Sequence, residues 1–403
     1  MFQKLVSRNN DIHRLVEKGY AIAFDGAHMI VRDIPYLDNE CNLQWGAFVS
    51  KLVFVDKECV QQDDHQIYFS GAVPYNLDGS PVQNLAGGPH SITLSDASKD
   101  VVVQRSFSNK LKVNGQAVSY ADFFDKIENY VATIAGPAMY KYGETPYTFR
   151  AVHGTTPQSV FKFQDTLTSR AEISDLSSRL ENDVIAIIGL GGTGSYLLDY
   201  LVKTPVKEIR AFDRDEYHVH NAFRSPGKLE ECDLGKTKAE VYDARYSNFR
   251  DGLNIKSIYI DGSSEEELSE VTFAFVCVDK GSSRSAIIDV LIAKRIPFID
   301  VGMGLKRSQN GSLKGMMRVT YFPVDMAQKI QSEQLVDSLD GPENIYRSNI
   351  QIGELNAMNA GFAVMRYKQV RGFYTEDNPY YHMLFDLWDQ QTATKELINE
   401  NPT

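Results

Sequence analysis

A glycine pattern after an apolar run is the clearest chemical signal in this 403-residue chain. The segment IIGLGGTGS places Gly189, Gly191 and Gly194 in the spacing GxGxxG, directly after the run DVIAIIG. Glycines at these positions permit a tight turn and let backbone N–H groups approach a phosphate at the start of a helix. The alternative is a turn that serves packing alone. A strand before the turn and a helix after it favour a nucleotide site.

An acidic residue follows at the distance that a nucleotide site requires. Asp213 ends the run EIRAFD, 19 residues after Gly194. A carboxylate in this position can accept hydrogen bonds from ribose hydroxyls. Asp215 lies two residues later, so the two carboxylates could also be a metal pair. We favour ribose contact for Asp213 and a structural role in the loop for Asp215.

Polar and charged residues after Asp213 indicate which nucleotide is bound. Asn221 and Arg224 are three residues apart, and Lys238 opens the next predicted helix. Asp279 ends a later apolar run, and Arg284 follows it by five residues. An enzyme that cleaves ATP needs cations over the phosphates and a carboxylate for magnesium. A nicotinamide enzyme instead needs a flat ring pocket and a proton donor. The residues therefore favour a polyphosphate ligand.

The elements that position these residues alternate between strands and helices after residue 180. Predicted strands are DVIAIIG, EIRAFD, NIKSIYID, FAFVCVD and PFIDVG, and predicted helices lie in GTGSYLLDYLVKT, GKTKAEVYDARYSNF and SSRSAIIDVLIAKR. This alternation predicts βαβ units and a largely parallel sheet. SLKGMMRVTYF predicts one or two antiparallel strands, and NIQIGELNAMNAGFAVMRYKQV a long helix. The aromatic segment NPYYHMLFDLWD is interpreted as core or dimer packing.

The first part of the chain has a different pattern. Two predicted helices, over residues 2–18 and 120–135, flank short alternating segments rich in Tyr, Val and Ile, which predict strands. We therefore expect an α+β domain over residues 1–150, a linker over 151–180, and a Rossmann-like α/β domain over 181–403.

Charge and cysteine content exclude several classes of protein. The chain has 42 Lys and Arg against 53 Asp and Glu, a net charge of −11, which argues against nucleic-acid binding. The four cysteines, Cys41, Cys59, Cys232 and Cys277, form no CxxC pair, so no cysteine zinc knuckle or disulfide framework is expected. No run of about 20 apolar residues and no export signal is present. We expect a cytoplasmic protein without membrane contact.

Residues 165–372 resemble the ThiF/MoeB/HesA family of adenylyltransferases, which are related to ubiquitin-activating (E1-like) enzymes. The resemblance rests on GxGGxG, a strand-end Asp, N-x-x-R, a Lys in G-x-x-K, and a second strand-end Asp followed by Arg, all in this order. It implies a ThiF-type adenylation domain that binds ATP. The implied ligands are Gly189, Gly191, Gly192, Gly194, Asp213, Asn221, Arg224 and Lys238 for ATP, and Asp279 for Mg²⁺. The implied catalytic residues are Arg224, Lys238, Asp279 and Arg170.

The resemblance also implies an arginine that reaches into the site of a partner subunit in a homodimer. Arg170, in TLTSRAEI, occupies the matching place, and Arg179 is the alternative. Departures from the family pattern concern cysteine. Two CxxC pairs that hold zinc in many members are missing, so no structural zinc is expected. No cysteine follows residue 278, where E1-like enzymes form a thioester. Cys277 is interpreted as buried packing, and Cys232 is the remaining thioester candidate near the site.

The family reaction is ATP-dependent adenylation of the C-terminal carboxylate of a ubiquitin-like protein, with release of pyrophosphate. The expected setting is a bacterial ubiquitin-like conjugation or sulfur-transfer pathway. Expected partners are a ubiquitin-like protein ending in glycine, and proteins that resemble ubiquitin-conjugating enzymes and JAB peptidases. We interpret residues 1–150 as an accessory domain that recognises such a partner. The alternatives are a non-catalytic nucleotide-binding scaffold and an NAD-dependent oxidoreductase.

Overall fold

The computed structural model describes residues 2–113, 116–152, 159–163, 165–171, 173–336 and 350–397. The chain forms two compact units, Met1–Ser174 and Asp175–Thr403. The dividing point falls within the expected linker, of which residues 153–158, 164 and 172 lie outside the described part.

The first unit is built on an antiparallel sheet. Its strands run in the order β1-β2-β3-β5-β7-β6, with β4 paired to β3, and β8 and β9 form a separate hairpin. Its elements are α1 (Phe2–Arg8), α2 (Asn10–Lys18), β1 (Ala21–Asp25), β2 (His28–Leu37), β3 (Leu43–Phe54), β4 (Val60–Gln62), β5 (Gln66–Ser70), β6 (Gly87–Pro89), the 3-10 helix η1 (Asp96–Ser98), β7 (Arg105–Ser108), β8 (Leu111–Val113), β9 (Gln116–Val118), α3 (Phe123–Ile134), α4 (Gly136–Tyr142) and α5 (Thr166–Arg170).

The helix expected over residues 2–18 is two helices. The break lies at Asn9, whose buried side-chain amide donates to the carbonyl oxygens of Leu5 and Glu58, each at 2.8 Å. An asparagine side chain that bonds the backbone in this way competes with helical hydrogen bonding. The apolar faces of α2 and α3 then cover one side of the sheet, where Leu15, Phe48 and Ile127 share a core.

The second unit is built on an eight-stranded sheet in the order β12-β11-β10-β13-β14-β15-β16-β17. The first five strands are parallel, and β14 to β17 are antiparallel. Its elements are α6 (Ser174–Ser177), η2 (Ser178–Leu180), β10 (Val184–Ile188), α7 (Gly192–Val202), β11 (Glu208–Phe212), α8 (Val219–Ala222), η3 (Glu231–Asp233), α9 (Lys238–Tyr246), β12 (Leu253–Lys256), β13 (Phe273–Val276), α10 (Gly281–Ala293), β14 (Phe298–Arg307), β15 (Leu313–Phe322), α11 (Ala327–Ser332), α13 (Gly353–Val370), β16 (Tyr380–Asp386) and β17 (Thr392–Glu396).

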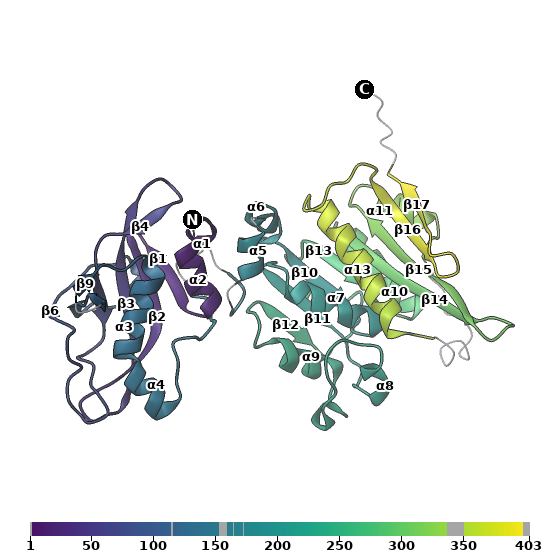
Figure 1. Ribbon diagram of the computed structural model, residues 1–403. Helices are drawn as coiled ribbons and strands as arrows, with labels where there is room; N and C mark the ends of the chain where they lie inside the picture. Colours follow the sequence, from purple (N-terminus) through teal and green to yellow (C-terminus); the bar gives the residue numbers. More distant parts are fainter. Residues whose placement is uncertain are drawn as a thin grey trace. The chain divides into compact units, whose positions relative to one another are not determined.

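Helices cover both faces of this sheet (Figure 1). Helices α7, α9 and α13 pack on one face through a core that includes Ile185 and Ile187 of β10. Helices α10 and α11 pack on the other face, against a core that includes Val184 and Ile188. Strand β10 is therefore buried on both sides, as its continuous apolar run predicts.

The chain leaves β10 toward β11 and β12 on one side and returns to β13 and β14 on the other. In an open parallel sheet the reversal of strand order creates a crevice at the carboxyl ends of the strands, and ligands bind there. The α/β class with a mostly parallel sheet after an earlier antiparallel domain confirms the expected fold. Strands β16 and β17 were not predicted, because NPYYHMLFDLWD was interpreted only as packing.

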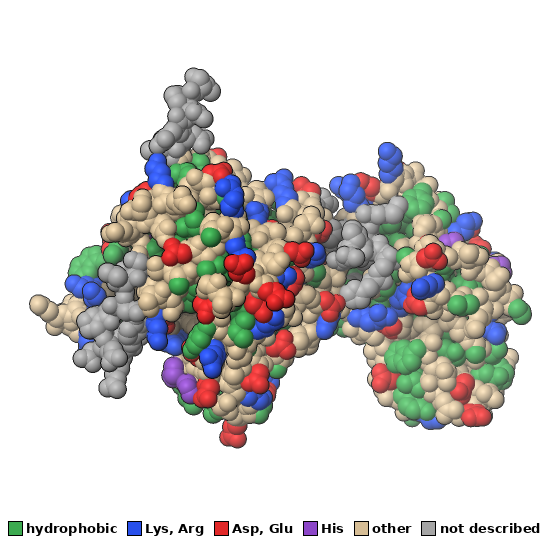
Figure 2. Space-filling view, turned by 180° about the vertical axis from the view of Figure 1, so that it is seen from behind, with side chains coloured by type: hydrophobic (Ala, Val, Ile, Leu, Met, Phe, Trp, Pro, Cys, Tyr) green, Lys and Arg blue, Asp and Glu red, His purple; other side chains and the backbone are tan. Residues whose placement is uncertain are grey.

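Surface charge and helix hydropathy add two observations. On the face in Figure 2, acidic and basic side chains are interspersed and neither sign forms a continuous patch. No helix within the described ranges has both the length and the apolar character that crossing a membrane requires.

A buried histidine links the antiparallel strands of the second unit. His382 on β16 is 5% exposed, and its Nδ1 lies 2.9 Å from the hydroxyl of Thr320 on β15. Burial lowers the pKa of His382 to about 4, and the charges of Arg318 and Lys395 add to this effect. The imidazole is therefore neutral in the folded protein near pH 7.

We expect this histidine to make stability depend on pH between its ordinary pKa of 6.5 and about 4. Within this window the unfolded chain binds a proton that the folded chain does not, so stability falls as pH falls, by at most about 1.4 kcal/mol per pH unit. His382→Gln should remove this share of the slope. Urea unfolding followed by circular dichroism at several pH values measures it. The exposed-site control His90→Gln should keep the full slope, and an unchanged slope in His382→Gln would contradict the assignment.

Candidate functional site

The glycine turn, residues 189–194, joins β10 to α7. Within it, the backbone at Gly194 lies very close to the backbone at Gly189. Gly189 has a φ of +94°, which favours glycine. A Cβ on Gly194 would lie 1.9 Å from the carbonyl oxygen of Gly189, so only glycine fits there. A Cβ on Gly191 would meet nothing within 4 Å. The first N–H groups of α7 have no acceptor within the helix and, with the helix dipole, favour an anion.

Asp213 lies directly after β11 and contacts this turn. Its carboxylate is 8% exposed and accepts hydrogen bonds from the backbone N–H groups of Leu190, at 2.7 Å, and Asp215, at 2.8 Å. The ammonium of Lys238 lies 3.2 and 3.3 Å from its two oxygens. The structure therefore brings the predicted ribose ligand and the predicted phosphate ligand into one ion pair.

Lys238, the first residue of α9, is 5% exposed. Its Nζ is also 2.8 Å from a carboxylate oxygen of Asp215. Burial lowers the pKa of Lys238, but the two carboxylates outweigh burial and raise the pKa above its usual value. The pKa of Asp215 is lowered because the hydrogen bond and charge of Lys238, with help from Tyr259 and Lys280, exceed the opposing effect of burial. Lys238 and Asp215 are therefore both charged near pH 7.

Asn221 lies in the short helix α8 and is 4% exposed. Its side-chain oxygen accepts from the backbone N–H of His218 at 2.8 Å, and its backbone oxygen accepts from the hydroxyl of Ser225 at 2.8 Å. The side chain therefore holds the loop that leads to Arg224. That a phosphate contacts Asn221 stays a prediction.

Arg224 is partly buried, and its Nε is a buried atom without a hydrogen-bond partner in the described part of the chain. Partial burial lowers the pKa of the exposed His220, and the charges of Arg224, His218 and Lys238 lower it further. Positive charge from two different elements thus converges at this loop. A buried guanidinium nitrogen without a partner is a feature that an anionic ligand would satisfy.

Asn356, which sequence reasoning did not identify, connects the glycine turn to the Arg224 loop. It comes from α13, is 1% exposed, accepts from the hydroxyl of Thr193 at 3.0 Å and donates to the carbonyl oxygen of Arg224 at 3.4 Å. A Cβ on Gly192 would lie 2.2 Å from its amide nitrogen. The available signal was an asparagine within the apolar stripe of a predicted helix.

Asp279 follows β13 and is exposed. Its carboxylate oxygens lie 3.3 and 3.5 Å from the side-chain nitrogen of Gln351, just before α13. The side-chain oxygen of Gln351 is buried and has no hydrogen-bond partner within the described residues. An exposed carboxylate suits Mg²⁺, which prefers oxygen ligands and keeps several waters. Gln351 was also missed from sequence.

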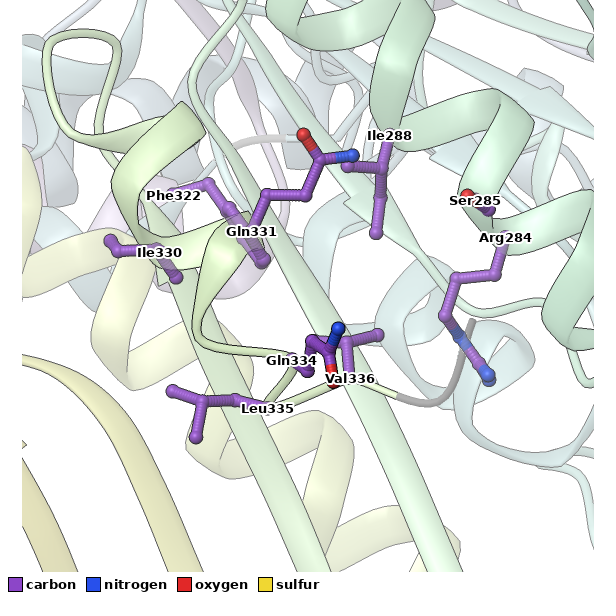
Figure 3. A pocket seen from close by; sticks show the side chains of 9 residues that line it. All are labelled: Arg284, Ser285, Ile288, Phe322, Ile330, Gln331, Gln334, Leu335 and Val336. Carbon is purple, nitrogen blue, oxygen red and sulfur yellow. The ribbon is translucent and has the colours of Figure 1, made fainter. Parts of the chain in front are cut away.

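Arg284 contributes to a buried ion pair rather than to the glycine turn. Its guanidinium donates to the carbonyl oxygen of Val278, and its Nε lies 3.1 Å from Asp300, which is 0% exposed and also pairs with Arg318 at 2.7 Å. The other side of Arg284 lines a cavity of about 170 Å³ between α10 and the α11 region (Figure 3). Sequence reasoning grouped Arg284 with the phosphate cations, and a phosphate contact of Arg284 stays a prediction.

The remaining candidate residues from the sequence are Arg170, Arg179 and Cys232. Arg170 ends α5, and its side chain is not among the described residues. Arg179 donates to the carbonyl oxygen of Gly372. Cys232 is exposed in η3, with its Sγ 3.6 Å from Glu230. Among the described residues, Glu230, Cys232 and Asp233 form the group that could hold a metal ion.

Cys277 lies between β13 and Asp279 and packs against the core beneath α7. Burial raises the pKa of its thiol well above the usual value, and the charges of Asp300 and Asp279 act in the same direction. A neutral buried thiol is a poor nucleophile. This environment fits the packing role expected for Cys277.

Comparison with known proteins identifies the part of the chain that holds most of these residues. Residues 167–340 match the ThiF family, and residues 10–166 match a domain of unknown function (DUF6791). The tRNA threonylcarbamoyladenosine dehydratase of Haemophilus influenzae is 25% identical over 132 residues, 32% of this chain. The chain spans half the length of this curated relative. Residues Gln351 and Asn356 follow the matched ThiF segment.

Solved structures that match part of this chain include PaaA and E. coli MccB. PaaA is 17% identical with a TM-score of 0.42, covering 56% of this chain and 76% of its own. E. coli MccB is 17% identical with a TM-score of 0.41, covering 55% of this chain and 64% of its own.

Gly194→Ala should destabilise the second unit, because the added methyl group would meet the carbonyl oxygen of Gly189. The expected loss is about 1–3 kcal/mol or more, as for overpacked interiors. Gly191→Ala is the matched control, since its methyl group points into open space, and should cost less than about 1 kcal/mol. Urea unfolding compares the two. Equal losses would show that the close approach at Gly194 does not constrain the turn.

Proposed function

We propose that this chain catalyses ATP-dependent adenylation of a carboxylate. The observation that supports this most strongly is the meeting of the glycine turn, Asp213 and Lys238 in one hydrogen-bonded group, inside a segment that matches the ThiF family. The carboxyl ends of the parallel strands also bring Asp279 and the Arg224 loop to this edge of the sheet. The arrangement suits a nucleotide whose phosphates face cations and whose ribose faces a carboxylate.

In the proposed reaction a carboxylate oxygen of the acceptor attacks the α-phosphorus of ATP. The new bond is O–Pα, and the bond that breaks joins Pα to the bridging oxygen of the β-phosphate. Pyrophosphate leaves with that electron pair, and the product is an acyl-adenylate. A carboxylate is already ionised near pH 7, so no general base is needed. Arg224 and Lys238 would neutralise charge that develops on the phosphates.

Magnesium fits the site as a companion of ATP. Asp279 would hold it, because this carboxylate is exposed at the end of β13 and its described contact is with an amide, Gln351. When bound, the ion supplies charge neutralisation at phosphate oxygens. Gln351 orients the Asp279 carboxylate, and its buried side-chain oxygen remains available to a ligand or water.

The proposed acceptor is the C terminus of a ubiquitin-like protein that ends in glycine, as the sequence resemblance implies. In this proposal the first unit, which matches a domain of unknown function, recognises that protein or a conjugating partner. Arg170 of a second copy would complete the phosphate site in a homodimer. Cys232 remains the candidate for any thioester step.

ATP–pyrophosphate exchange tests the proposal. The chain should catalyse exchange when a ubiquitin-like protein ending in glycine is present, and Arg224→Ala and Asp279→Ala should each reduce the rate by about 100-fold, a typical loss for one group that stabilises transition-state charge. Arg295→Ala and Asp325→Ala are matched controls, because these residues form an exposed ion pair away from the turn. ATP binding without exchange across a panel of such proteins would indicate a nucleotide-binding scaffold instead.

A further inference from the structure

We propose that Lys238 makes binding of the nucleotide ribose conditional on the phosphates, so that the site accepts ATP and rejects the nucleoside adenosine. This inference rests on the proposed function, in which Asp213 binds the ribose and Lys238 binds a phosphate. It starts from the contacts of Asp213, which are already occupied.

The two oxygens of the Asp213 carboxylate make four hydrogen-bond contacts with three donor groups. One oxygen accepts from the N–H of Leu190 and the other from the N–H of Asp215, and both lie within 3.3 Å of the Lys238 ammonium. A carboxylate offers about four lone-pair sites. The two hydroxyl groups of a ribose can therefore both hydrogen-bond to the Asp213 carboxylate only if the Lys238 ammonium moves away from it.

Withdrawal of Lys238 is unfavourable unless another anion accepts its ammonium. The side chain is buried and charged, and a buried charge that loses its partner is strongly destabilised. Asp215 holds the ammonium from a second side, with Nζ and a carboxylate oxygen 2.8 Å apart. A ribose hydroxyl is neutral and cannot replace Asp213 as the counter-ion.

A polyphosphate supplies the missing counter-ion. Leu190, in the glycine turn, and Lys238 both donate to Asp213, so the ammonium lies close to the start of α7, where the phosphates are expected. The lysine side chain has a flexible stem of four carbons. Its ammonium can therefore move from Asp213 to a phosphate oxygen, which leaves the Asp213 carboxylate open to the ribose. Phosphate binding and ribose binding are thereby coupled through one side chain.

The test measures the binding of two ligands, ATP and adenosine, to the full chain by isothermal titration calorimetry. In the unchanged protein, ATP should bind at least about 100-fold more tightly than adenosine. In Lys238→Met, ATP affinity should fall by about 10-fold or more while adenosine affinity rises, because Asp213 is released. The opposite directions distinguish this role from general damage, which would weaken both ligands.

Two further variants, Asp215→Asn and Lys236→Met, test the same inference. Asp215→Asn removes the second anion beside the ammonium and leaves Asp213 as its counter-ion. Withdrawal of Lys238 then costs more for a neutral ligand, so adenosine affinity should fall by about 3-fold or more, while ATP, whose phosphates replace the counter-ion, should lose less. Asp215→Asn decides the question if circular dichroism shows that Lys238→Met does not fold. Lys236→Met, the same substitution at an exposed lysine two residues away, should leave both affinities unchanged.

Failure of the proposed function and failure of the coupling through Lys238 give different results. If the unchanged protein does not bind ATP, the proposed function fails. If ATP binds, but adenosine affinity does not rise in Lys238→Met and the ratio of ATP affinity to adenosine affinity does not rise in Asp215→Asn, the proposed function stands and the coupling through Lys238 is wrong.

Discussion

The buried carboxylate of Asp213 is the interaction on which the rest of the site depends. It accepts hydrogen bonds from the turn after β10 and from its own loop after β11, and it pairs with the first residue of α9. Three segments that are separate in sequence are thus fixed around one charged group. Because a buried charge must be paired, these segments cannot move apart without a large cost in free energy. In the proposed function, the charge that orders the site is also the one that a ribose would use.

Helix α13 supplies a second constraint, from the opposite end of the chain. At its start, Asn356 joins the glycine turn to the backbone of Arg224. At its end, Tyr367 and Arg371 donate to Asp183, the residue that precedes β10, at 2.6 to 2.9 Å. The helix therefore lies along the central strand and is tied at both ends. These ties hold the start of α7 in register with the Arg224 loop, which a nucleotide needs if its phosphates are to meet both.

The sequence predicted the parallel strands of the second unit, the turn and the acidic strand end, because each is a local pattern. A continuous apolar run marks β10, and glycine spacing marks its exit toward α7. It did not predict Asn356 or Gln351, because their partners lie more than 70 residues away and polar residues in a helix have many uses. Arg284 was assigned by spacing alone, and spacing could not show the buried Asp300 that receives its charge. Local signals identified the elements, and tertiary contacts decided the partners.

The position of α13 also determines when this site can form during synthesis. The turn, Asp213 and Lys238 all precede residue 240, but the side chain that closes the turn belongs to residue 356. Chains emerge from the ribosome at about 5–20 residues per second, and contacts distant in sequence form late. More than 100 residues must therefore leave the ribosome after Lys238 before the turn is complete. A nascent chain that ends before α13 would contain every glycine of the glycine turn. It would still lack the helix that holds this turn against the Arg224 loop.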